Sequence, residues 1–93
     1  GIVKIIRKTH DLASVNKGEI LVTSMTRPDM IVAMEKAAGI ITDEGGVTCH
    51  AAVISRELNI PCIIGTKTAT EILKNGDYVE LDADNGIVKK IKA

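Results

Sequence analysis

His50 stands in a sequence context that suits nucleophilic chemistry on phosphorus. Residues 39–42 are apolar and typical of a buried strand, and the Gly45 and Gly46 that follow them are typical of a turn. Thr48 is typical of a helix N-cap. This order predicts that His50 lies in the first turn of a helix. Unpaired backbone N–H groups and the positive end of the helix dipole lie there, and both stabilise an incoming phosphoryl group.

Two other roles for this histidine can be weighed from the residues alone. A histidine near a helix start also occurs as a plain surface or capping residue. A zinc site would need His10, Cys49, His50 and Cys62 together. Neighbouring residues on a helix point about 100° apart, and no C-x-x-C or H-x-x-x-H pair exists. We therefore predict no metal site, and we expect both cysteines to be reduced core residues.

The amino-acid sequence around the histidine resembles a known motif. Residues 43–52 read DEGGVTCHAA and residues 55–61 read SRELNIP. Together they closely resemble the phosphohistidine motif of the phosphoenolpyruvate-utilising enzymes, with phosphoenolpyruvate synthases (pyruvate, water dikinases) as the nearest members. Residues 20–26, 29–38 and 63–66 also resemble the mobile domain of that family, so the resemblance covers most of the chain.

The resemblance implies a role for each residue of the motif. His50 would be the catalytic nucleophile. It would be phosphorylated at one partner site and would give up its phosphoryl group at a second one, to which the domain swivels. Gly45, Gly46, Thr48 and Cys49 would support it. Thr48 either caps the helix or contacts the phosphohistidine, and the sequence leaves both roles open. Cys49 stands where many relatives carry serine, whose hydroxyl is a stronger hydrogen-bond donor.

The resemblance also implies partners that this chain does not encode. ATP would phosphorylate the histidine in a nucleotide-binding domain, and pyruvate would accept the phosphoryl group in a barrel domain with magnesium. The chain itself has no Gly-rich phosphate loop, so we expect it to bind no cofactor and to complete no turnover alone. The alternative is a non-catalytic regulatory or interaction domain, of the kind appended to some bacterial pyruvate kinases.

Arg27 is the candidate for a further phosphate contact. It follows the apolar residues 19–23, which are typical of a buried strand, and precedes a helix expected near residues 28–38. A guanidinium at that place has the planar fork that binds phosphate, although many such arginines are solvated surface residues. The loop that carries Arg27 and the loop that leads to His50 would both lie at the carboxyl end of one sheet, where ligands of open α/β sheets bind.

The remaining elements form the framework around these loops. Thr26 or Ser24 is the expected cap of the helix 28–38, whose methionines should face the core. On the helix that carries His50, an apolar arc of Ala51, Val53, Ile54 and Leu58 should face inward. The other expected elements are a strand at 2–6, a helical turn at 11–15, a strand at 62–64, a helix at 68–74 with Ala69, Ile72 and Leu73 inward, and a hairpin of 77–82 with 87–91.

About six strands and three helices predict one compact α/β domain over residues 1–93, and the resemblance names it the swivelling β/β/α fold. Twelve basic and twelve acidic side chains balance, and Tyr78 is the single aromatic residue, so a nucleic-acid partner is not expected. No apolar run is long enough to cross a membrane, and a cytoplasmic location is the default expectation. The first residue is not methionine, which suggests a segment excised from a larger enzyme.

Overall fold

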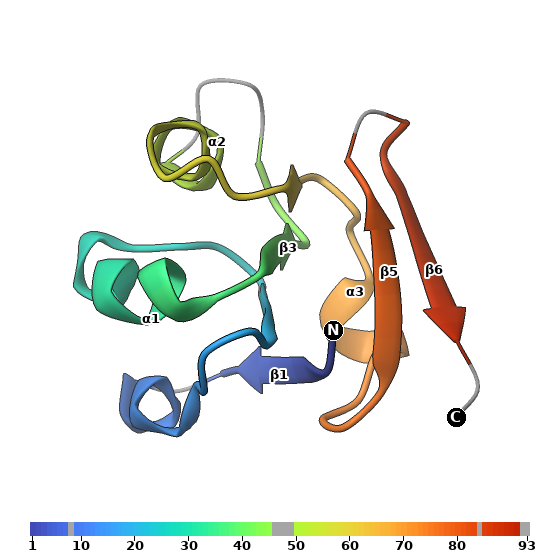
Figure 1. The fold of residues 1–93 in the computed structure, drawn as a ribbon, viewed down its shortest axis with the longest axis horizontal. Coiled ribbons are helices and arrows are strands. Elements are labelled where there is room, and N and C mark those ends of the chain that lie inside the picture. Colours follow the sequence, from blue (N-terminus) through green and yellow to red (C-terminus); the bar gives the residue numbers. More distant parts are fainter. Residues whose placement is uncertain (8, 46–49, 84, 92–93) are drawn as a thin grey trace.

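The computed structural model describes residues 1–7, 9–45, 50–83 and 85–91. Within these residues the chain forms six strands, three α-helices and two 3-10 helices, which confirms the expected α/β class (Figure 1). The strands are β1 (Val3–Ile6), β2 (Ile20–Thr23), β3 (Gly39–Thr42), β4 (Cys62–Ile63), β5 (Tyr78–Asp82) and β6 (Ile87–Ile91). The α-helices are α1 (Ile31–Lys36), α2 (His50–Glu57) and α3 (Ala69–Ile72), and the 3-10 helices are Thr9–Ser14 and Pro28–Met30.

The first four strands form one parallel sheet in the order β1-β2-β3-β4. Each is joined to the next by a helical connection, and these connections lie on the same side of the sheet (Figure 1). Because the strands are parallel, their carboxyl ends meet along one edge. The segments that leave this edge begin at Arg7, Ser24, Asp43 and Ile64.

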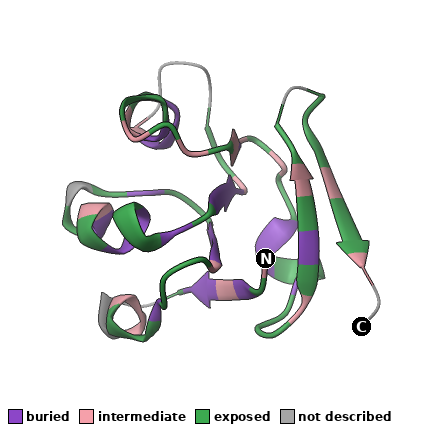
Figure 2. Ribbon diagram, in the orientation of Figure 1, coloured by how far each residue is buried: buried purple, intermediate pink, exposed green. Residues whose placement is uncertain are grey.

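Two layers of side chains cover the two faces of the parallel sheet. Leu21 and Ile40 pack toward α1, while Val22 and Ile41 pack toward α3 and β5 on the other face. This alternation is the two-residue period of a strand covered on both faces. Strands β5 and β6 pair with one another as an antiparallel hairpin, so the layers run helices, sheet, hairpin with α3. Burial is concentrated on the inner strands and the inward helix faces (Figure 2).

The structure corrects the predicted inner face of α2. Ala51, Ala52 and Ser55 are buried, whereas Val53 is 37% exposed. Small side chains let the helix approach the sheet closely, and the Ser55 hydroxyl is satisfied by donating to the Ala52 carbonyl oxygen at 3.2 Å. Close backbone approach has therefore set the buried face of this helix more than side-chain hydrophobicity has.

Two other expectations of the sequence are wrong. Ile72, expected to face inward, is 63% exposed at the end of the single turn α3, whereas Ala69 and Leu73 are buried as expected. The helix expected from residue 28 begins as a 3-10 turn, and α1 starts only at Ile31 with no side-chain cap. The hydroxyl of Thr26, one of the two expected caps, has a different partner.

Candidate functional site

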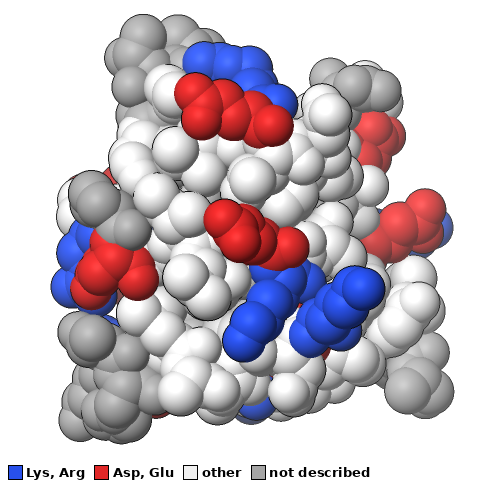
Figure 3. Space-filling model, turned by 60° about the vertical axis from the view of Figure 1, so that its left-hand side comes forward, with Lys and Arg blue, Asp and Glu red and all other residues white. Residues whose placement is uncertain are grey.

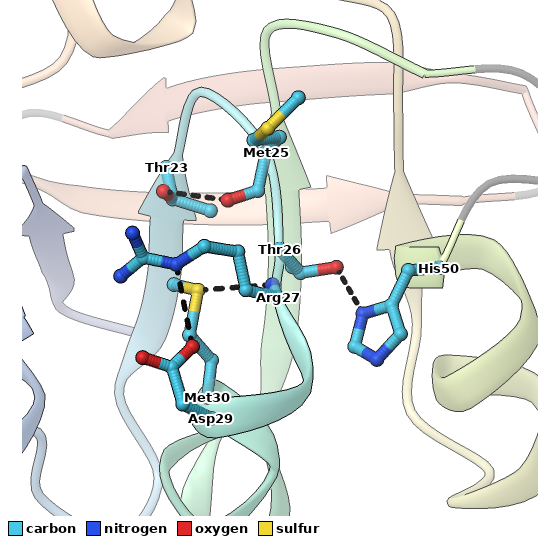
Figure 4. A network of polar contacts seen from close by, with 7 residues as sticks. All are labelled: Thr23, Met25, Thr26, Arg27, Asp29, Met30 and His50. Carbon is cyan, nitrogen blue, oxygen red and sulfur yellow. Dashed lines mark hydrogen bonds and ion pairs between the residues drawn. The ribbon is translucent and has the colours of Figure 1, made fainter.

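His50 is the first residue of α2 and its side chain is half-buried. The Nδ1 atom of its ring lies 2.7 Å from the Oγ1 atom of Thr26. The two side chains point toward one another across the carboxyl edge of the sheet (Figure 4). Thr26 is only 8% exposed, so its hydroxyl is a fixed partner for the ring. The prediction that His50 lies in the first turn of the helix is confirmed.

This contact engages Nδ1, and the role of each ring nitrogen then depends on the tautomer. In a neutral imidazole one nitrogen carries the proton and the other carries a lone pair. With the proton on Nδ1, the Thr26 oxygen accepts a hydrogen bond and the lone pair resides on Nε2. Nε2 is then the nucleophilic atom, and the ring is held by a partner that does not obstruct it.

Thr26 is positioned by the loop that follows β2. The Thr23 hydroxyl donates to the carbonyl oxygen of Met25 at 3.1 Å, which ties the loop back to the end of the strand. Beyond Thr26, the backbone N–H of Met30 donates to the Arg27 carbonyl oxygen at 2.9 Å, which closes the 3-10 turn. Thr26 therefore lies between two short local bonds, and its backbone has little freedom to withdraw from the histidine.

The loop after β3 runs beside the loop after β2. The backbone N–H of Asp43 donates to the Thr23 carbonyl oxygen at 3.1 Å, and that of Glu44 donates to the Ser24 carbonyl oxygen at 2.9 Å. These bonds extend the pairing of the two strands by two residues. The segment that leads toward His50 is thereby aligned with the segment that carries Thr26.

The connection between β4 and α3 holds the β3 loop from its other side. The Asp43 carboxylate accepts hydrogen bonds from both the backbone N–H and the hydroxyl of Thr70. The backbone N–H of Lys67 donates to the Asp43 carbonyl oxygen at 2.8 Å. The Thr66 hydroxyl donates to the Thr42 carbonyl oxygen at 3.0 Å. The β3 loop is thus anchored on two sides at Asp43, by the β2 loop and by the segment around Thr70.

A cavity of about 290 Å³ opens beside the histidine. Its lining comes from both loops and from the start of α2, and consists of Met25, Thr26, Thr42, Glu44, Gly45 and Ala51. Gly45 has a φ of 134°, a conformation that residues with a Cβ rarely adopt. The backbone conformation therefore favours glycine at 45, where the residue also lines the cavity.

The structure places the other predicted site residues as follows. Gly46, Thr48 and Cys49 lie outside the described residues. The Arg27 guanidinium points away from His50, to the opposite side of the β2 loop (Figure 4). There its Nε atom lies 3.3 Å from a carboxylate oxygen of Asp29. Within the described residues, no group of three or more His, Cys, Asp or Glu side chains is arranged to hold a metal ion.

Thr26 is the site residue whose role sequence reasoning missed. It lies 24 residues before His50, and its type and position are equally typical of a helix cap. The available signal was that both residues follow neighbouring strands at the same sheet edge.

No helix of the described part of the chain is long and apolar enough to cross a membrane.

The architecture matches that of a solved structure. An NMR solution structure of an Enzyme I protein (nEIt) superimposes with a TM-score of 0.73 over 85% of this chain, at 31% sequence identity. This chain covers 33% of that one. The parallel sheet with its antiparallel hairpin is therefore the fold found in part of Enzyme I.

Sequence comparison identifies the family. The model of the mobile domain of PEP-utilising enzymes matches residues 15–86, and the chain belongs to this family. It is 60% identical to a probable phosphoenolpyruvate synthase of Methanothermobacter thermautotrophicus over 95% of its length. It is 54% identical to a phosphoenolpyruvate synthase of Pyrococcus furiosus over 97% of its length. The chain spans only 13% and 11% of these two relatives. It corresponds to one small portion of a larger enzyme.

Proposed function

We propose that this chain is the phosphoryl-carrier domain of a phosphoenolpyruvate synthase-like enzyme, and that His50 is the residue phosphorylated. The single observation that carries the proposal is the bond between His50 Nδ1 and Thr26 Oγ1, which leaves Nε2 as the nucleophile at the carboxyl edge of the sheet. The family match and the relatives named phosphoenolpyruvate synthase support it.

The transfer takes place in two balanced steps. In the first, the Nε2 lone pair forms a bond to phosphorus while the bond from phosphorus to the donor's leaving oxygen breaks. The leaving oxygen takes the electron pair. The ring gains positive charge while Nδ1 keeps its proton, so the bond to Thr26 becomes charge-assisted and stronger. In the second step a base of the partner domain takes a proton from the acceptor, the resulting anionic oxygen bonds to phosphorus, and the P–N electron pair returns to the ring.

The donor and acceptor belong to partner domains. We propose ATP, bound in a nucleotide-binding domain, as the donor, and pyruvate, bound in a barrel domain with magnesium, as the acceptor. This chain contributes the nucleophile, the orienting hydroxyl and the open turn at Gly45. Gly46, Thr48 and Cys49 complete the proposed support of the phosphohistidine. Whether Arg27 contacts a phosphate remains a prediction, and its direction away from His50 points to a different oxyanion.

The proposal is tested by phosphorylation of the chain with its partner domains supplied in trans and an isotopically labelled phosphoryl donor. His50→Asn should abolish an acid-labile, base-stable label, because an amide cannot form a phosphoramidate. His10→Asn, at the other of the two histidines in the chain, is the matched control and should keep the label.

Thermal unfolding separates chemistry from packing in the same variants. His50 is half-buried and the amide of asparagine can imitate one hydrogen bond of the imidazole, so His50→Asn should melt close to the unaltered chain. A label that persists in His50→Asn refutes the carrier role of this residue. Absence of any label in the unaltered chain, with active partner domains present, would favour the regulatory alternative.

A further inference from the structure

A second cavity lies at the same sheet edge, on the far side of the β2 loop from His50. Its volume is about 320 Å³. It is lined by Ile6, Arg7, Thr23, Ser24, Met25, Arg27, Met30 and Thr70. We call it the arginine cavity, because two guanidinium-bearing residues, Arg7 after β1 and Arg27 after β2, contribute to its wall. The proposed transfer chemistry at His50 uses neither of them.

Arg7 is fixed by a contact at its tip. Its Nη2 atom donates to the backbone carbonyl oxygen of Thr70 at 2.6 Å, which holds the guanidinium against the start of α3. A guanidinium has five N–H donors arranged in a plane, so one contact orients the group without exhausting it. This plane matches the two oxygens of a carboxylate or two oxygens of a phosphate.

Arg27 reaches the cavity from the opposite loop. Its Nε atom pairs with Asp29 at 3.3 Å, and both side chains are about half exposed. In Figure 4 the guanidinium extends beyond the end of β2, away from Thr26. An exposed pair of this kind contributes little stability, so a better-placed oxyanion in the cavity competes effectively with it.

The floor of the arginine cavity is apolar. Ile6 is 2% exposed and Met30 is 1% exposed, and both contribute to the lining. These two residues add an apolar surface beside the two guanidinium groups. A small acid with a short apolar stem fits this combination better than a fully hydrated ion does.

The nearby carboxylates have partners of their own. Asp43 accepts two hydrogen bonds from Thr70, and Asp11 accepts one from the backbone N–H of Arg7. Asp29 is the pair of Arg27. On the face shown in Figure 3 the acidic and basic side chains are interspersed rather than gathered by sign. Recognition of an anion therefore depends on the local fork of two arginines and not on a broad basic surface.

We propose that the arginine cavity is an oxyanion site that binds a carboxylate or phosphate group distinct from the one His50 carries. Met25, which is 50% exposed, lines both cavities and stands between them. A molecule or surface that approaches His50 along the sheet edge therefore also meets the arginines. The oxyanion comes either from a small free acid or from an acidic side chain of the partner domain docked at His50.

The first experiment does not depend on the proposed function. Inorganic phosphate and acetate are titrated separately into the 93-residue chain at constant ionic strength, and backbone and arginine Nε signals are followed by NMR. We expect saturable shifts at Arg7, Arg27 and the Thr23–Met25 segment. Arg7→Gln and Arg27→Gln should each weaken binding about tenfold, the effect of losing one charge-assisted contact.

Control variants make this experiment specific. Arg56→Gln removes an arginine that lines other cavities, and it should leave the titration unchanged. Arg7→Lys and Arg27→Lys keep the charge but lose the planar fork, so they should restore part of the affinity. Circular dichroism of each variant establishes that it is folded, which matters for Arg7 because it also holds Thr70.

The second experiment, which rests on the proposed function, identifies a protein source for the oxyanion. With partner domains supplied in trans, Arg7→Gln and Arg27→Gln should raise the domain concentration needed for half-maximal labelling of His50, and added salt should reduce this difference. Saturable binding of the free anions supports a free acid, whereas this salt-dependent change without free-anion binding supports a docked side chain. If both variants behave as Arg56→Gln does in both experiments, the oxyanion site is refuted. Failure of His50 labelling in the unaltered chain refutes the carrier role and leaves the first experiment standing.

Discussion

Replacing Thr26 by valine tests the geometry on which the nucleophile depends. Valine has nearly the shape of threonine but lacks the hydroxyl that lies 2.7 Å from His50 Nδ1. Thr26 is 8% exposed, so the substitution adds an apolar methyl group to a buried position and creates no cavity. The change therefore isolates one hydrogen bond.

The size of the effect follows from the two charge states of the ring. In the resting state the lost bond is between neutral groups and is worth about 1 kcal/mol. His50 is half-buried, so water can replace part of this bond and the loss of folding stability should be smaller. In the transition state the ring becomes positive, and a hydrogen bond to a charged group is worth about 1.5 to 3 kcal/mol. The difference of about 0.5 to 2 kcal/mol corresponds to a roughly two- to thirty-fold slower transfer.

Single-turnover labelling of His50 by rapid quench measures this rate. Thr26→Ser is the matched control, because it retains the hydroxyl and loses only a methyl group. Ring ¹⁵N NMR of the unphosphorylated chain reads the tautomer, which should lose its preference for the proton on Nδ1 in Thr26→Val. A transfer rate in Thr26→Val within twofold of the original, or an equal loss in Thr26→Ser, would show that this bond does not orient the nucleophile.

Substitutions at three further positions test the β3 loop and, at Asp77, the electrostatic stability of the fold. Asp43→Ala removes the acceptor of both Thr70 bonds and should slow labelling of His50 in the single-turnover assay more than Asp43→Asn does, since an amide oxygen still accepts from the backbone N–H. Gly45→Ala should lower the melting temperature and slow labelling, because φ at this position is 134°. The N–H of Lys74 lowers the pKa of Asp77 from its ordinary 3.8, with help from the ammonium of Lys90. Asp77 therefore stabilises the fold above pH 3.8 and loses this effect as pH falls through its lowered pKa, so Asp77→Asn should reduce urea stability at pH 7 and make little difference well below that pKa.

For each of these substitutions, a different result would contradict the expected role of the residue. Equal labelling rates in Asp43→Ala and the unaltered chain would mean that the Thr70 contact does not hold the β3 loop in place for transfer. An unchanged melting temperature in Gly45→Ala would show that the turn relaxes to accept a side chain. A stability difference in Asp77→Asn that persists unchanged in acid would assign its effect to packing and not to the carboxylate charge.

The fold was predictable wherever its signals are local. The apolar residues 39–42 predicted a strand whose observed bounds are Gly39–Thr42. The hairpin was predicted from alternation on either side of a turn, and β5 and β6 pair as expected. The strand, turn and helix order also placed His50 correctly at the start of α2. These features depend on two-residue and helical periods and on turn residues, which a single sequence displays directly.

Features that depend on packing between elements were predicted poorly. On α2, hydrophobicity favoured Val53 as an inward residue, but the helix buries Ser55 because a small side chain permits a close approach to the sheet. The surface that decides this burial lies in another element, and no periodic pattern along α2 reports it.

The contact between Thr26 and His50 depends on the pairing register of β2 and β3, which no local sequence motif reports. Strands β2 and β3 are paired with Thr23 opposite Thr42, and their loops remain aligned for two more residues. Counting from this pair, Thr26 is three residues beyond β2, within reach of a ring that begins the next helix. A slip of one residue in the β2–β3 register would send each side chain of one strand to the opposite face and move Thr26 along the edge by about 3.3 Å, more than a hydrogen bond tolerates. Such a slip would also exchange Leu21 with Val22 between two differently packed faces, so the packing that stabilises the sheet in this register also keeps Thr26 beside His50.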